Sequence, residues 1–202
     1  IDALNLFSRK YRHEVLGVNY YQENAPQYIV DQDFIPRCIT SAVVVFEGVK
    51  AGSNPLHTIM WTALGYPACA VAVPLLVHGA HLPYYMLARD TAAAQANDLH
   101  SEMCDASLQI KDQWAFPMHI SNGKRYVALQ TILVDNEDKP ALMTCTNDVE
   151  TKIQSDFLPL YQQWEKGALS DQIFFKWYDR VANQWMRYYN KVFAPYNHSS
   201  ID

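Results

Sequence analysis

Two histidines stand close together in the chain, and histidine side chains both bind metals and transfer protons. His78 and His81 are three residues apart, so a helix would be needed to bring both rings to one face. Gly79, Pro74 and Pro83 argue against a regular helix there, and no glutamate follows in the manner of a zincin motif. We therefore expect loop histidines that face solvent or line a rim, and we expect no metal and no cofactor.

The candidate nucleophiles are four cysteines, Cys38, Cys69, Cys104 and Cys145. No two of them form a CxxC pair, which argues against a zinc ribbon, and four are too few for a disulfide scaffold in this length of chain. A cysteine hydrolase needs a base beside the thiol and a pair of oxyanion donors, and no local signature supports this. Cys145 precedes an expected helix start, where the helix dipole would lower its pKa. The simpler interpretation of Cys145 is a residue beside the helix cap, and that of the cysteines in general is a buried small hydrophobic side chain.

Arg37 is the candidate binding residue. It directly follows Pro36, which restricts the backbone at the start of an expected strand. Its face of that strand would also carry Ile39, Ser41, Val43 and Val45. An arginine there needs a carboxylate or a substrate anion, because an unpaired buried guanidinium costs several kcal/mol. The pattern alone favours an arginine that extends to solvent at the start of the strand; the alternative is an Arg37 that is partly buried and points toward a cleft.

The elements that position these residues begin with three apolar segments in succession, 38–49, 56–64 and 68–73. Their short links, which contain Gly, Asn and Pro, predict an antiparallel meander. The first segment is apolar on both of its faces, which predicts a strand covered on two sides. A later strand is expected at 126–134, joined through Asn122-Gly123 to a partner at 116–120.

Helical spacing accounts for most of the remaining chain. A short pattern opens it (Leu4, Phe7, Tyr11), residues 19–32 are expected to be loop, and a helical stripe runs from Ala92 to Ile110. A capping box at 147–150 predicts a helix that Pro159 would kink, and a final helix is expected to start near Ser170. The prediction is an α+β protein: antiparallel sheet or sheets with segregated helices.

Composition narrows the functional classes. The 202 residues suit a single domain spanning 1–202, and the net charge of −5 gives no electrostatic footprint for nucleic acid. No apolar run is long enough to span a membrane. The start, Ile1-Asp2-Ala3, is not a signal peptide and has no initiator methionine. We therefore expect a processed or truncated chain.

Two runs resemble a known family. Residues 33–45 (DFIPRCITSAVVV) are followed by 47–52 (EGVKAG), and residues 58–67 (TIMWTALGYP) by 70–74 (AVAVP). Together they resemble the C-terminal half of linear-amide hydrolases of the N-terminal-nucleophile superfamily. The branch is that of isopenicillin-N acyltransferase and carcinine hydrolase, related to choloylglycine hydrolases and penicillin V acylases, in Bacteroidetes-type forms. The resemblance covers roughly residues 30 to 75.

The resemblance implies a four-layer αββα sandwich and a nucleophilic cysteine freed at the N-terminus, whose own α-amino group is the base. Arg37 matches the family's arginine beside the nucleophile, which holds its charge or the substrate. The resemblance therefore makes Arg37 the catalytic candidate, and we expect it to be partly buried and to point toward a cleft. The cysteine, its neighbouring arginine and aspartate, and the oxyanion-hole asparagine would then lie upstream of Ile1. Cys38 is internal and has no free α-amino group, so it does not match the nucleophile.

The expected function is that of the C-terminal part of a longer hydrolase or acyltransferase for a small-molecule linear amide. Its partner would be the missing N-terminal half or a second copy, and the inner face of the sheet would be exposed through Val43, Val45 or Val71. The resemblance suggests a periplasmic or secreted location. Residues 1–202 alone should have no amidase activity. The alternative is a non-catalytic binding or structural module that keeps the half-fold, so whether this chain is an enzyme stays open.

Overall fold

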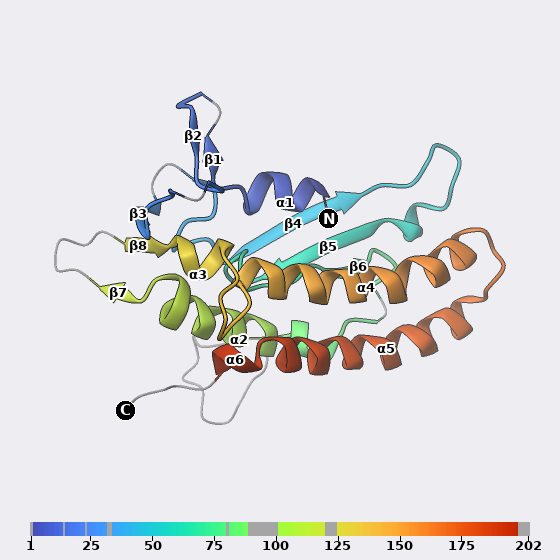
Figure 1. Ribbon diagram of the computed structural model, residues 1–202. Helices are drawn as coiled ribbons and strands as arrows, with labels where there is room; N and C mark the ends of the chain where they lie inside the picture. The colour runs from blue at the N-terminus through green and yellow to red at the C-terminus, as the bar shows by residue number, and fades with distance from the viewer. Residues whose placement is uncertain are drawn as a thin grey trace.

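The computed structural model describes residues 2–13, 15–22, 24–31, 34–79, 81–88, 101–119 and 125–197 (Figure 1). In these residues the protein is α+β, as predicted, with antiparallel sheets and separate helices. The predicted helical stripe from Ala92 to Ile110 is described only in its second half, as α2 (Glu102–Ile110), and its first half lies outside the described residues.

The principal sheet has the order β4-β5-β6, with β4 at Ala42–Glu47, β5 at Ile59–Leu64 and β6 at Val73–Leu76. Both pairs are antiparallel, so the predicted meander is confirmed. A 3-10 turn, η2 (Pro55–His57), lies in the link between β4 and β5.

The third strand was predicted too early, at 68–73. Gly65 ends β5 with a φ of 110°, a value that favours glycine, and packs so closely on α2 that a Cβ would lie 2.3 Å from Ser107 Oγ. The chain then turns: Cys69 N–H and Ala70 N–H both donate to Tyr66 O. Strand β6 begins only at Val73 and contains Pro74, the residue directly after the predicted segment. An edge strand tolerates proline because the missing N–H costs no ladder bond on its open side.

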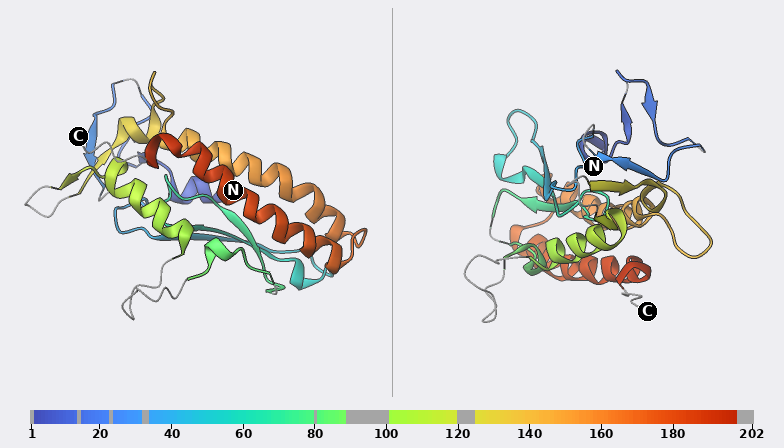
Figure 2. Two further views of the ribbon diagram at one scale, coloured as in Figure 1. Left: turned by 90° about the horizontal axis from the view of Figure 1, so that it is seen from below. Right: turned by 90° about the vertical axis from the view of Figure 1, so that its left-hand side faces the viewer.

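Two long helices, α4 (Leu142–Glu165) and α5 (Asp171–Val192), lie side by side along the sheet (Figure 2). Phe157 of α4 contacts the ring of Trp61 in β5 edge-on at 5.8 Å, and Tyr178 OH of α5 donates to Pro74 O at 2.7 Å. The predicted start of α5 near Ser170 is confirmed, and Ser170 Oγ caps the helix by accepting from Ile173 N. Helix α4 begins five residues before the predicted capping box, at Leu142, and continues through Pro159.

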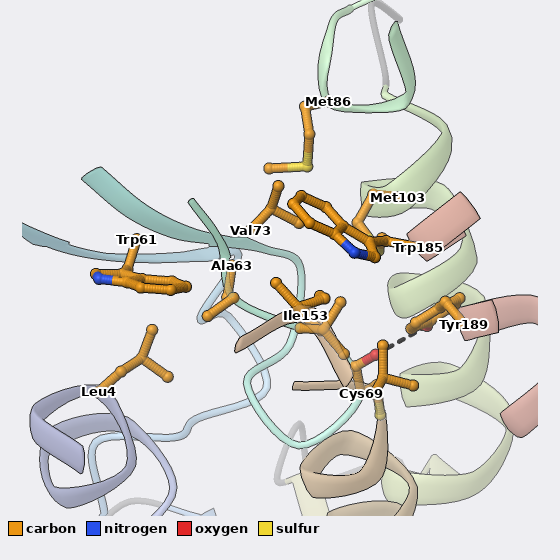
Figure 3. Packing of buried hydrophobic residues seen from close by; sticks show 14 of the residues in the cluster. Leu4, Trp61, Ala63, Cys69, Val73, Met86, Met103, Ile153, Trp185 and Tyr189 are labelled. Atoms are coloured by element: carbon orange, nitrogen blue, oxygen red, sulfur yellow. Dashed lines mark hydrogen bonds between the residues drawn. The ribbon is translucent and has the colours of Figure 1, made fainter. Parts of the chain in front are cut away.

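Shorter elements complete the fold. Helix α1 (Asp2–Ser8) lies against β4, the 3-10 turn η3 (Tyr84–Met86) lies against α2, and α6 (Ala194–Asn197) follows α5. Leu4, Trp61, Met86, Met103 and Trp185 come from five different elements and belong to one buried cluster (Figure 3). One core therefore joins the sheet to the helices around it.

A second small sheet has the order β3-β8-β7, with β3 at Tyr28–Val30, β8 at Arg125–Ala128 and β7 at Met118–His119. The predicted pairing of the segments on either side of Asn122-Gly123 is confirmed, and that turn itself lies outside the described residues. The predicted strand at 126–134 is wrong beyond Ala128, where α3 (Leu129–Leu133) begins.

The segment predicted as loop at 19–32 contains β3 and the end of a hairpin, β1 (Arg12–His13) with β2 (Val18–Asn19). Both were missed because strands of two or three residues are too short to show an alternating pattern. They are ordered by their partners in the sheet rather than by their own sequence.

Strand β4 is covered on one face only, so the prediction that both its faces are covered is wrong for the described residues. Val43 and Val45 pack against the core, whereas Val44 is 43% exposed and Phe46 is 65% exposed. The expectation that Val43, Val45 or Val71 would be exposed is also wrong, since the first two are half-buried and Val71 is fully buried. The uncovered apolar side chains lie on the opposite face.

Candidate functional site

Arg37 lies in an exposed turn ahead of β4, so the prediction that it is partly buried and points toward a cleft is wrong. Because the strand begins at Ala42, the alternation that placed Arg37 on an inner face does not reach it. Its backbone N–H donates to Ile35 O at 2.8 Å, and its Nε donates to Phe34 O at 3.1 Å. No carboxylate among the described residues forms an ion pair with this guanidinium. The side chain is held at Nε and exposed to solvent beyond it.

The turn that carries Arg37 is fixed from its buried side. Asp31, a buried carboxylate, accepts from Cys38 N at 2.6 Å. Thr40 Oγ1 donates to Ile35 O at 3.0 Å, and Tyr66 OH donates to Pro36 O at 3.3 Å. We call residues 34–41 the 34–41 turn. It presents a cation from a hydrogen-bonded backbone, which suits a group that must hold an anion in one place.

The thiols of this chain are not activated. Burial is the largest cause of a raised pKa at Cys38, Cys69, Cys104 and Cys145, and at Cys145 the pKa reaches about 11. The sequence places Cys145 just before a helix start, where the dipole would lower its pKa, although a residue beside the cap is the simpler interpretation. It lies inside α4 instead, in the apolar core, so the shift is upward. A protonated thiol is a poor nucleophile, and all four cysteines are free of disulfides.

The two loop histidines face helix α5. His81 Nδ1 lies 2.8 Å from Asp179 Oδ2, and its ring stacks on Phe175 at 4.6 Å. His78 lies over the same Phe175 ring at 4.7 Å, with Nε2 3.9 Å from Asp171 Oδ2. The pair therefore ties the loop after β6 to α5. In the described part of the chain, no three His, Cys, Asp or Glu side chains come together as a metal site.

Sequence reasoning missed the one fully buried ion pair of the described structure. Arg9 Nη2 lies 2.7 Å from Glu150 Oε1, and Nη1 lies 2.8 Å from Glu150 Oε2, so the pair is bidentate. The remaining guanidinium donors reach Asn5 Oδ1 at 2.6 Å, Pro67 O at 2.6 Å and Ala70 O at 2.8 Å. All five donors of the arginine are used, so no donor remains for a substrate.

The ion pair holds a buried segment that we call the 66–74 segment. Glu150 Oε1 also accepts from Ala72 N at 2.7 Å. Thr146 Oγ1 donates to Ala68 O at 2.8 Å, and Tyr189 OH donates to Cys69 O at 2.8 Å (Figure 3). Side chains thus replace the sheet partners that this irregular backbone lacks, as buried peptide groups require.

The sequence carries only a weak signal for this pair. Glu150 falls between Val149 and Ile153, which both belong to the buried stripe of α4, so its position is compatible with burial. Arg9 follows α1 with no apolar run around it. Nothing local connects two residues that are 141 positions apart.

No family model matches the chain, and no curated protein and no solved structure gives a significant match. The N-terminal-nucleophile resemblance therefore rests on the residues quoted for it. None of the described helices combines the length and apolar character needed to cross a membrane.

Proposed function

We propose that this chain is the C-terminal portion of a linear-amide hydrolase or acyltransferase, with an N-terminal cysteine nucleophile upstream of residue 1. The observation that carries the proposal is the uncovered apolar face of β4, exposed at Val44 and Phe46, directly after a turn that holds an exposed Arg37. A sandwich needs a second layer over that face. Both features lie in the segment that resembles the family.

In this proposal the cysteine thiol attacks the amide carbonyl carbon, and the cysteine's own α-amino group takes the thiol proton. The C–N bond breaks, the proton goes to the leaving amine, and a thioester remains. Water then hydrolyses the thioester, or an amine accepts the acyl group. Arg37 supplies a fixed positive charge beside the thiolate or the substrate, for which its guanidinium has donors beyond the Nε used by Phe34 O.

The second candidate is a non-catalytic module with the same sheet. The observation that favours it is the exposure of Arg37, the catalytic candidate, which lies in a turn and not in a cleft. A chain of this kind would bind a partner through the same uncovered face without performing chemistry.

The test compares residues 1–202 with the protein extended by the segment encoded upstream. Penicillin V, conjugated bile salts and an acyl-homoserine lactone serve as linear amides. We expect turnover only by the extended protein, and we expect Arg37→Ala to reduce it without loss of folding. Arg187→Ala, a change at an exposed position on α5, is the matched control and should leave turnover unchanged.

Two results would overturn the proposal. Thiol-sensitive turnover by residues 1–202 alone would assign the nucleophile to an internal cysteine. Absence of turnover in both proteins, with both folded, would leave the binding module as the better account.

A further inference from the structure

A cavity of about 440 Å³ lies between the 34–41 turn, α2 with the helical turn that follows it, and β8. This volume falls in the range of small-molecule sites. Arg37 is not among its lining residues, which include Cys38, Ile39, Leu108, Lys111, Phe116 and Arg125. The cavity is therefore separate from the exposed guanidinium on which the proposed function rests.

Positive charge predominates on the cavity wall. Lys111 and Arg125 contribute two cations and Asp112 one carboxylate. The Lys111 side chain is only 14% exposed, while that of Asp112, with Oδ1 3.2 Å from Lys111 Nζ, is 61% exposed. Lys111 is thus a largely desolvated cation whose carboxylate partner is well hydrated, so its charge is only partly compensated.

Lys111 also has a donor to spare. Its Nζ donates to Cys38 O at 3.3 Å and contacts Asp112, which uses two of the three N–H groups of an ammonium. The described residues supply no further partner for the third. Burial and the nearby Asp31 carboxylate raise the pKa of the Cys38 thiol, and the charges of Arg125 and Lys111 act less strongly to lower it.

The backbone beside the cavity is unusual. Helix α2 ends at Ile110, and the chain then forms a π-helical turn, η4 (Lys111–Ala115). Such turns are rare and occur frequently at functional sites, because the extra residue changes the direction of the side chains. Here the turn begins with the lysine that lines the cavity.

The rest of the wall is apolar. Leu108 and Phe116 line it, and Ile39 at its margin is 80% exposed. An apolar surface next to a partly compensated cation suits a molecule that has an anionic head and a hydrocarbon body.

We propose that this cavity binds a small amphipathic anion, whose carboxylate or phosphate head contacts Lys111 and Arg125 and whose apolar part lies against Leu108, Phe116 and Ile39. The inference goes beyond the proposed function and does not depend on it, because binding here requires neither Arg37 nor an upstream nucleophile.

The rate at which iodoacetamide alkylates each cysteine, followed by peptide mass spectrometry, reports whether a ligand occupies the cavity. Cys38 lines the cavity, and Cys104 on α2 is also half-buried but does not line it, so Cys104 is an internal control. The probes are hexanoate and hexyl phosphate, with hexanol, hexylamine and inorganic phosphate for comparison. We expect one or both amphipathic anions to slow alkylation of Cys38 about tenfold at ten times Kd, with Cys104 unaffected.

The preference between hexanoate and hexyl phosphate identifies the head group. Protection by hexanol equal to that by the anions would overturn the electrostatic part of the proposal. Inorganic phosphate as effective as hexyl phosphate would refute the apolar part, and protection by none of the probes would refute the site.

Substitutions separate a ligand contact from a structural one. Lys111→Gln should weaken hexanoate or hexyl phosphate binding about tenfold or more, and Lys111→Arg, which keeps the charge, should restore most of it. Asp112→Asn should strengthen binding, because it removes the competing carboxylate, and Lys176→Gln on α5 is the control. Affinity unchanged by Lys111→Gln, or lowered by Asp112→Asn, would contradict the assigned contacts.

Discussion

The 66–74 segment and the 34–41 turn with β4 lie in the same half of the chain. They differ in how fully their polar groups are paired and their apolar side chains are buried. Beside the 66–74 segment the buried Arg9 uses all five of its donors, and side chains satisfy the irregular backbone of the segment. In the 34–41 turn, the Arg37 guanidinium is bonded at Nε and extends to solvent beyond it. Strand β4, which follows, exposes the apolar side chains of Val44 and Phe46. Complete pairing indicates a structural role, and incomplete pairing leaves Arg37 and the exposed face of β4 accessible for a further contact.

The largest effect that this comparison predicts is at Glu150. Glu150→Gln keeps the size of the side chain but leaves the buried Arg9 without its counter-charge. We expect the free energy of unfolding to fall by about 3–5 kcal/mol, measured by urea denaturation of residues 1–202. Glu165→Gln, an isosteric change near the end of the same helix, should cost less than about 0.5 kcal/mol. Equal losses in the two variants would mean that the ion pair does not hold the 66–74 segment.

A smaller effect is expected at Tyr189. Tyr189→Phe removes the hydroxyl that donates to Cys69 O at 2.8 Å and leaves a buried carbonyl without that partner. The expected loss is about 1–2 kcal/mol. Its neighbour Tyr188, which bonds the exposed Asp148 at 3.2 Å, offers the matched control. Tyr188→Phe should change stability by less than about 0.5 kcal/mol, and a reversed order would show that the carbonyl is satisfied in another way.

The smallest effect is predicted at Phe46, in the open region. Phe46→Thr keeps a side chain that favours β-strands and should change the stability of residues 1–202 by no more than about 0.5 kcal/mol. In the protein extended upstream, the same change should cost about 2 kcal/mol or more if a second layer covers this face. Thermal unfolding of both proteins measures the difference. An equal effect in the two would mean that the upstream segment does not lie on β4.

The sequence pattern correctly predicted those helices and strand pairings that neighbouring residues specify. Apolar periodicity predicted the helix that starts near Ser170, and short turn-rich links predicted the antiparallel order of β4, β5 and β6. The sequence pattern did not predict where β6 begins, because Pro74 is tolerated in a strand that lies at the edge of the sheet. It was also insufficient at Leu129, whose N–H bonds Gln27 O just as β8 ends and α3 begins. In both places a distant partner decides the conformation.

For the candidate site residues, too, the sequence determined some properties and the tertiary structure decided the others. The sequence alone determined that Arg37 follows a proline ahead of an apolar strand, and it placed four cysteines and a histidine pair. The tertiary structure decided that Arg37 is exposed, that burial raises the thiol pKa values, and that His78 and His81 face Asp171 and Asp179. Only the tertiary structure paired Arg9 with Glu150, because burial and charge compensation between residues 141 positions apart leave no periodic trace in the chain.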